Sequence, residues 1–323
     1  MSEKSPVLER LNYAGDIVPV LERAAEAFGA GSLRDFSIIG VGYEDCNVIV
    51  ETDQRRYVAK IFQKGRSAED INRYVLIMEK ALDAGVNHPK IHRTQTEEIV
   101  YSDPQAQGLS MVLMDFIEGK TFLDMKRTPT DEERRQIIEQ AVKVNSIDHH
   151  PTYVKDSWAI PNIQEMFDRV REFIEPNDLR LVKEAVSLYS EIPVSNLPHC
   201  FVHGDFTKTN IIKGKDGEIY ILDFSVANWY PRIQELAVIS ANLLHDEKDS
   251  LSLYKRTELV ADEYSVLKPI TSEEKGYLYP YALAGVAMEF MGGHQEKFIN
   301  ENYTEETEYW IKLGREGLHQ ALL

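Results

Sequence analysis

Strand-like and helix-like patterns occupy different parts of this chain, and this separation restricts the possible fold more than any other feature of the sequence. Short runs rich in β-branched and aromatic residues, bounded by turn-prone residues, occur at 36–40, 46–51, 56–62, 98–101 and 110–116. A helical pattern from Ser67 to about Ala84 interrupts them. We therefore expect the first third of the chain to form a mostly antiparallel sheet with one inserted helix, ending near 116–119.

Helical patterns dominate the remainder. Thr130 and Glu133 have the spacing of a capping box and predict a helix through Val144. Further helices are expected from Asn162 to about Glu175, over 178–189, and from Thr271 onward. The fold class is therefore α+β, with a sheet-rich lobe at 1–116 and a larger helical lobe at 117–323.

The charge of the chain excludes several classes of partner. Its 323 residues carry a formal net charge of −17, which would repel nucleic acid and anionic membrane surfaces. The longest apolar stretch, 278–291, contains Pro280 and Glu289 and is too short to span a bilayer. We expect no nucleic-acid partner, no membrane association and a cytoplasmic location. Only two cysteines occur, which is consistent with free thiols in a reducing compartment.

A hairpin interrupts the helical part, and polar residues flank it. Its strands are expected at 210–213 and 218–224, joined by a turn at Asp216-Gly217. A hairpin brings its two ends together, so Asn210 and Asp223 should be neighbours. Asp205 lies on the loop just before them.

These three side chains suit phosphoryl transfer. One carboxylate and one amide oxygen make a hard-oxygen site for Mg²⁺, which takes its remaining ligands from water and phosphates. Asp205 could then accept the proton of a hydroxyl group. Taken singly, each residue is more often a turn or cap residue; together around one hairpin they favour a catalytic interpretation.

The sheet-rich lobe contains residues that would suit a nucleotide such as ATP. Lys60 lies in an apolar strand, where a lysine needs a partner. Gly40 and Gly42 lie between the two preceding strands, where backbone N–H groups could approach phosphates. A plain hairpin turn explains that glycine pair equally well. The segment containing Asp115 and Ile117 leaves the last strand and could offer backbone groups to an adenine edge.

The pattern His203-Gly204-Asp205, then Asn210, then Asp223-Phe224, with Lys60 upstream, resembles the aminoglycoside phosphotransferase and choline kinase group of protein-kinase-like enzymes. The resemblance extends from about Phe36 to the C-terminal helices. It implies a protein-kinase-like bilobal fold, and ATP and Mg²⁺ as cofactors.

The resemblance also implies roles for individual residues. Asp205 matches the catalytic base, and His203 matches the histidine that stabilises its loop. The magnesium ligands match Asn210 and Asp223. Lys60 matches the lysine that holds the α- and β-phosphates, and Asp115 and Ile117 match the positions that bind adenine through their backbone. Glu235 lies where the family usually has an aspartate that supports the catalytic loop.

Some positions depart from the family pattern. The third glycine of the phosphate loop is absent, and Tyr43-Glu44-Asp45 follows instead. The family pattern requires a glutamate that pairs with Lys60, and both Glu69 and Glu79 on the inserted helix are candidates. Lys208 could reach the γ-phosphate or could be a solvated loop lysine.

The acceptor is expected to be the hydroxyl group of a small molecule. Only the short segment 224–234 separates Asp223 from Glu235, which leaves little room for a peptide platform. Trp158, Trp229 and Glu289 are candidate substrate residues. Aromatic faces and the acidic excess of the last quarter of the chain favour a cationic acceptor, such as an amino sugar or an amino alcohol. The alternatives are a non-catalytic nucleotide-binding module and a protein serine kinase.

Overall fold

The computed structural model describes residues 11–40, 45–246 and 251–322. The chain divides into two compact units. The smaller contains Met1–Leu82 and His88–Glu118, and the larger contains Asp83–Asn87 and Gly119–Leu323.

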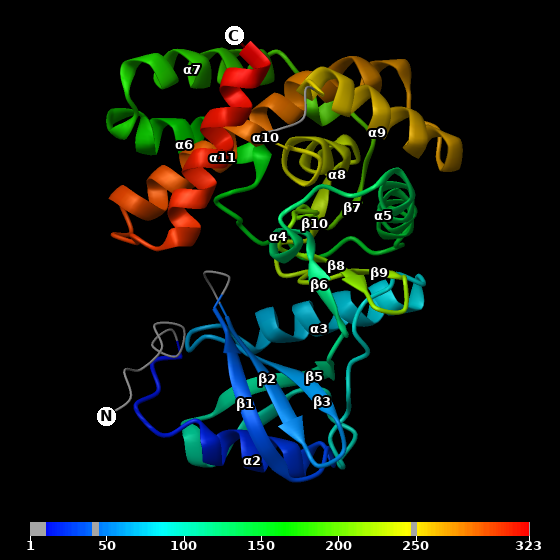
Figure 1. Cartoon of the computed structure of the whole chain (residues 1–323), viewed down its shortest axis with the longest axis vertical. Helices are drawn as coiled ribbons and strands as arrows, with labels where there is room; N and C mark the ends of the chain where they lie inside the picture. Colours follow the sequence, from blue (N-terminus) through cyan, green and yellow to red (C-terminus); the bar gives the residue numbers. More distant parts are fainter. Residues whose placement is uncertain (1–10, 41–44, 247–250, 323) are drawn as a thin grey trace. The chain divides into compact units, whose positions relative to one another are not determined.

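An antiparallel sheet forms the centre of the smaller unit, as the sequence predicts (Figure 1). Its strand order is β1-β2-β3-β5-β4. The strands are β1 (Leu33–Ile39), β2 (Cys46–Thr52), β3 (Arg56–Ile61), β4 (Tyr101–Asp103) and β5 (Leu109–Asp115). The fourth strand begins where the predicted one ends.

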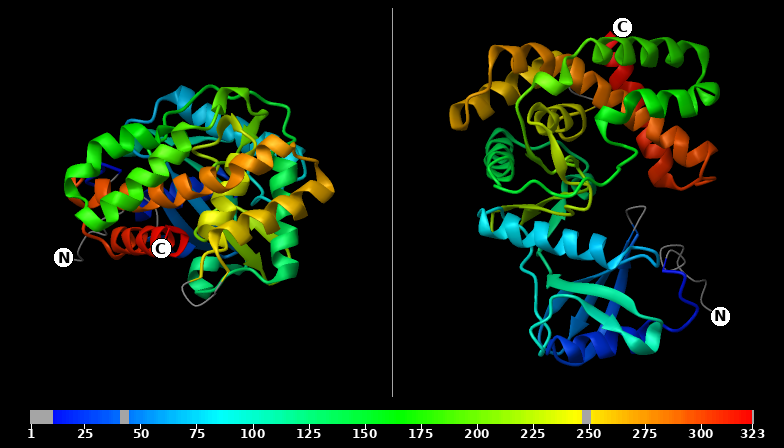
Figure 2. Two further views of the ribbon diagram at one scale, coloured as in Figure 1. Left: turned by 90° about the horizontal axis from the view of Figure 1, so that it is seen from above. Right: turned by 180° about the vertical axis from the view of Figure 1, so that it is seen from behind.

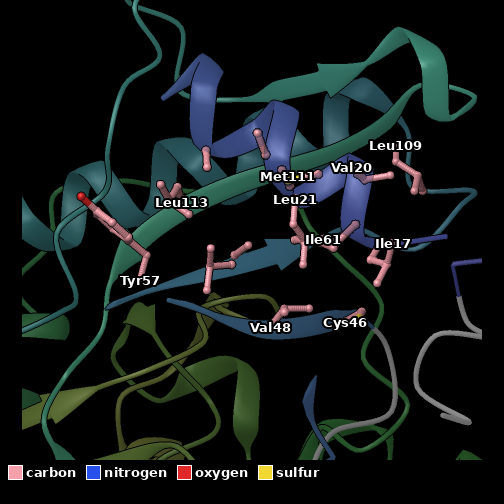
Figure 3. Packing of buried hydrophobic residues seen from close by; sticks show 14 of the residues in the cluster. Ile17, Val20, Leu21, Cys46, Val48, Tyr57, Ile61, Leu109, Met111 and Leu113 are labelled. Atoms are coloured by element: carbon pink, nitrogen blue, oxygen red, sulfur yellow. The ribbon is translucent and has the colours of Figure 1, made fainter. Parts of the chain in front are cut away.

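Two helices cover this sheet. α2 (Val18–Ala27) packs its apolar side on β2, β3 and β5 and closes the core shown in Figure 3. α3 (Ala68–Asp83) is capped by Ser67, the residue before it, whose Oγ accepts a hydrogen bond from Asp70 N at 3.0 Å. The predicted start of this helix is confirmed. Tyr74 and Met78 of α3 pack with Phe62 in a second apolar cluster.

The hairpin of the larger unit belongs to a three-stranded sheet. β8 (Ile211–Gly214) and β9 (Ile219–Ile221) pair antiparallel as predicted, although the return strand ends three residues early. β6 (Gly119–Thr121), which the sequence did not reveal, adds to the other side of β8. β7 (His199–Val202) precedes the hairpin in sequence and β10 (Asn228–Pro231) follows it. These two strands pair with each other as a second short antiparallel sheet.

Helices make up the rest of the larger unit. α10 runs among α6, α7, α8, α9 and α11 (Figures 1 and 2). The helices are α4 (Phe122–Met125), α5 (Asp131–Val144), α6 (Ile163–Val170), α7 (Pro176–Ser190), α8 (Ile233–Val238), α9 (Leu253–Leu267), α10 (Ser272–Phe298) and α11 (Glu305–Leu322). A π-helix, Ile239–Leu243, follows α8 directly.

The helix starts predicted at Thr130 and Thr271 are confirmed, and each carries a capping box. Thr130 and Glu133 bond reciprocally at the start of α5, and Thr271 and Glu274 do so at the start of α10. Asn162 does not cap α6, because its side chain donates to the carbonyl of Asp156 at 2.6 Å. That helix also ends at Val170, five residues before the predicted end.

Among residues 11–40, 45–246 and 251–322, no helix combines the length and apolar character that crossing a membrane requires.

Candidate active site

His203 is fixed as a neutral imidazole at the start of the predicted catalytic loop. Its Nδ1 accepts a hydrogen bond from Asp205 N at 3.1 Å, and its Nε2 donates to the carbonyl of Leu222 at 2.9 Å. An N–H donor on one side and a carbonyl on the other leave only the tautomer protonated at Nε2. Burial lowers the pKa of His203 to about 4, which keeps the ring uncharged. The histidine therefore ties the loop to the end of the hairpin.

Asp205, the predicted base, lies against Asn210, a predicted metal ligand. Asn210 Nδ2 donates to Asp205 Oδ2 at 2.5 Å and to the Asp205 carbonyl at 3.2 Å. Burial raises the pKa of Asp205 to about 7, and the negative charges of Asp156 and Asp223 act in the same direction. The carboxyl group is thus surrounded by other acidic groups, where a bound cation would be favourable.

Asn210 and Asp223 are brought together as the sequence predicts. Leu222 N donates to the carbonyl of Asn210 at 2.8 Å, so the two ends of the hairpin are in contact. The backbone of Asp223 is left-handed, with a φ of 58°, and its Oδ1 accepts from Ser225 N at 3.2 Å. This turn places a carboxylate at the end of the strand without continuing the ladder.

The donor set fits Mg²⁺. Since Asn210 directs its NH₂ group to Asp205, its amide oxygen points away from that carboxylate and is available, like the carboxylate of Asp223, as a hard oxygen donor. Within the described part of the chain, no group of three or more His, Cys, Asp or Glu could hold a metal ion. A magnesium ion held by these two side chains would take its remaining ligands from water and phosphate oxygens.

Glu235 holds the first two residues of the predicted catalytic loop through their backbone N–H groups. This residue of α8 is fully buried, and its two oxygens accept from His203 N at 3.0 Å and Gly204 N at 2.9 Å. Burial raises its pKa to about 7, while the two backbone donors oppose that shift. The longer glutamate thus takes the position where the family resemblance implies an aspartate.

A polar chain connects the catalytic loop to α10. Asn242, in the π-helix, accepts from Lys208 N at 2.9 Å and donates to Glu289 Oε1 at 2.6 Å. Lys208 Nζ donates to the carbonyl of His245 at 2.5 Å, so it is not the solvated lysine of one sequence interpretation. Burial raises the pKa of Glu289 to about 7.

Two of the three candidate substrate residues lie in or against α10. The indole of Trp158 packs on Gly292, one helical turn from Glu289, so closely that a Cβ at 292 would lie 2.5 Å from Trp158 Cε3. Trp229 instead stacks on His150, with ring centroids 4.7 Å apart.

In the smaller unit, Lys60 is almost completely buried, with 2% of its surface exposed. Its Nζ lies 3.5 Å from Asp45 Oδ2 and 4.7 Å from the centroid of the Tyr74 ring. Neither glutamate suggested by the sequence is its partner: Glu79 binds Arg93 at 2.8 Å, and Glu69 is exposed at the start of α3.

The other predicted nucleotide-binding positions are less constrained. Gly40 is exposed at the end of β1, and Gly42 lies outside the described residues. Asp115 N donates to the carbonyl of Lys90 at 2.9 Å. A backbone contact of Asp115 with an adenine would therefore use the Asp115 carbonyl. Ile117 is half-buried, two residues beyond β5.

Comparison with known proteins identifies the family. Residues 35–270 match the model of the phosphotransferase enzyme family. The chain belongs to this family. It is 21% identical to a homoserine kinase of Zymomonas mobilis over 267 residues, which cover 81% of each chain.

Solved structures of this family share the fold. A spectinomycin phosphotransferase in complex with ADP and spectinomycin has a TM-score of 0.67, 13% identity and 93% coverage of both chains. An amicoumacin kinase in complex with AMP-PNP and Ca²⁺ has a TM-score of 0.64 and 14% identity, covering 98% of this chain and 96% of its own. The protein-kinase-like fold predicted from the motifs is confirmed.

Family membership settles the class of reaction. The protein is a kinase that transfers a phosphoryl group to a hydroxyl group of a small molecule. The sequence-based alternatives of a non-catalytic module and a protein serine kinase are not supported.

Sequence reasoning missed three residues of this phosphotransferase. Asp45 and Asn242 were not distinguished from ordinary polar residues, because their partners are far away in sequence. Asp156 was missed as well, although its charge acts on Asp205. Its place two residues before Trp158 was the one available signal.

Proposed function

We propose that this phosphotransferase uses ATP and Mg²⁺ to phosphorylate the hydroxyl group of a small molecule that carries a protonated amine. One observation carries the proposal: Asp205, Asn210 and the end of the hairpin that bears Asp223 are joined by short hydrogen bonds. A base next to two hard-oxygen donors is the arrangement that phosphoryl transfer requires.

Each residue then has a defined task. Asp205 orients the acceptor hydroxyl and accepts its proton. The Asn210 amide oxygen and the Asp223 carboxylate hold the metal ion, which neutralises the phosphates when bound. Lys60 binds the α- and β-phosphates, while Asp115 and Ile117 meet the adenine with backbone groups. Their arrangement on the nucleotide is inferred from the family resemblance.

An amine on the acceptor is supported by Glu289. One of its oxygens accepts from Asn242, while the other is buried and has no hydrogen-bond partner among the described residues. A buried acceptor without a donor is unfavourable, and a protonated amine would supply one. Trp158 packs on Gly292, one helical turn from Glu289, so an aromatic side chain lies against the same helix that carries this carboxylate. The homoserine of the curated relatives is itself an amino acid with a terminal hydroxyl.

A panel of acceptors tests the substrate class. We expect ADP release in the presence of MgATP to be stimulated by amine-bearing alcohols such as homoserine, aminopropanol or choline. Their counterparts without the amine, hydroxybutyrate, propanediol and dimethylbutanol, should be poorer by at least about tenfold in kcat/KM, which is about 1.4 kcal/mol. Equal rates with and without the amine in each pair would contradict the proposed amine.

Replacement of the base tests the chemistry. Asp205→Ala should abolish turnover and leave nucleotide binding measurable by calorimetry. Loss of nucleotide affinity with turnover retained would contradict the role of Asp205. Asp216→Ala is a suitable control, because this exposed aspartate lies in the turn of the same hairpin and bonds only locally.

A further inference from the structure

The burial of Lys60 poses a physical problem that the sheet itself must solve. A lysine with 2% of its surface exposed pays a large desolvation penalty unless a negative charge lies close to it. In protein kinases this charge comes from a glutamate on a helix, so the position of that helix controls the pair. Here α3 contributes an aromatic ring, Tyr74, and no carboxylate to Lys60.

Asp45 supplies the charge from the start of β2. The residue is 5% exposed, and Oδ1 accepts from Gln63 N at 3.1 Å and Arg66 Nε at 3.0 Å. Oδ2 lies 3.5 Å from Lys60 Nζ and makes no hydrogen bond within the described ranges. One oxygen is therefore anchored, and the other faces the ammonium group of Lys60.

Strand pairing creates this geometry. β2 and β3 pair with Asn47 opposite Lys60 and Cys46 opposite Ile61, so Asp45 falls beside the end of β3. The contact needs only the β2–β3 ladder and the turn that follows β3 at Gln63. No helix has to move for the two charges to meet.

The distance also suits a positioning role. At 3.5 Å the attraction is electrostatic, longer than the 2.7–3.2 Å of a normal N–H···O bond. The carboxylate therefore restrains the ammonium without taking up one of its donors in a short hydrogen bond.

We propose that Asp45 positions Lys60 for the nucleotide phosphates, replacing a helix glutamate with a carboxylate built into the sheet. The inference rests on the proposed function, in which Lys60 binds these phosphates. It also means that the charge pair is assembled whenever the sheet is folded.

The test compares two isosteric changes at buried carboxylates of the smaller unit. Asp45→Asn should raise the dissociation constant for MgAMP-PNP by at least about tenfold, or about 1.4 kcal/mol. Asp103→Asn is the matched control, because Asp103 is fully buried and binds Arg23 at 2.7 Å, outside the proposed site. It should lower the unfolding temperature and leave the dissociation constant within about twofold of wild type. Unchanged or tighter nucleotide binding by Asp45→Asn would overturn the proposal.

A double-mutant cycle separates positioning from general damage. In a Lys60→Met background, Asp45→Asn should cost less than about twofold further affinity, because the residue it positions is gone. An equal cost in both backgrounds would overturn the proposal. If Asp45→Asn does not fold, Asp45→Glu is the second variant, because it keeps the charge but moves it one methylene further from the backbone. This variant should bind nucleotide a few-fold more weakly than wild type, and wild-type affinity would contradict the inference.

Failure of the wild-type protein to bind MgAMP-PNP would overturn both the proposed function and this inference.

Discussion

Glu235→Gln is the most discriminating test of how the catalytic loop is held. The carboxylate accepts from two backbone N–H groups, those of His203 and Gly204, in a fully buried environment. Glutamine has almost the same shape, but it offers only one oxygen, and its NH₂ group would face the second N–H. One buried backbone donor loses its partner, which costs about 1–3 kcal/mol. Since the remaining bond also loses its charge assistance, we expect the free energy of unfolding to fall by about 2–4 kcal/mol.

The loop carries His203 and the proposed base, so activity should fall together with stability. Urea unfolding gives the first quantity, and kcat at saturating substrates gives the second, at a temperature where both proteins are folded. Glu274→Gln is the control: Glu274 is also fully buried, but it binds Arg232 and caps α10. It should lose stability and keep kcat within a few-fold of wild type. A Glu235→Gln enzyme with wild-type stability and kcat would refute this account of the loop.

Three further changes test other parts of the structure. Gly314→Ala should lower the unfolding free energy by about 1–3 kcal/mol in thermal unfolding, because its Cβ would lie 2.4 Å from the backbone of α10. Gly276→Ala is the control, because open space surrounds that glycine, and it should not destabilise the protein in the same assay. A hydrogen bond from Arg127 lowers the pKa of Glu133 to about 2, so the stability that Glu133 contributes above its usual pKa of 4.5 is lost as the pH falls towards 2. The difference in urea stability between wild type and Glu133→Gln should therefore shrink between pH 6 and pH 3, and a constant difference would contradict the assignment. Asp223→Ala should weaken nucleotide binding in Mg²⁺ and leave the metal-free affinity much less affected, as calorimetry with and without EDTA would show; equal losses would contradict its role as a metal ligand.

Local patterns account for what could be predicted from the sequence. The hairpin brings Asn210 and Asp223 together because a short connection, residues 215–218, joins neighbouring strands, and the capping boxes at Thr130 and Thr271 involve partners three residues apart. In each case the chain segment that carries the signal also carries its partner.

Contacts between distant segments account for what was missed. The expectation that Glu69 or Glu79 pairs with Lys60 assumed that the partner lies on the helix, whereas the pairing of β2 with β3 supplies Asp45. Likewise, Asn242 contacts Lys208 and Glu289, more than thirty residues away on either side. No periodicity or short motif records such contacts, because they depend on how complete elements pack.

The π-helix at Ile239–Leu243 has a consequence for how sequences of this family are aligned. A π-turn contains about one residue more than an α-turn, so it shifts the rotational phase of whatever follows it. Removing a single residue from this segment would restore α-helical winding and rotate the following side chains by about 100°. Asn242 would then turn away from Lys208 and Glu289. A relative one residue shorter here therefore has a different side chain at this junction, even if an asparagine aligns with Asn242.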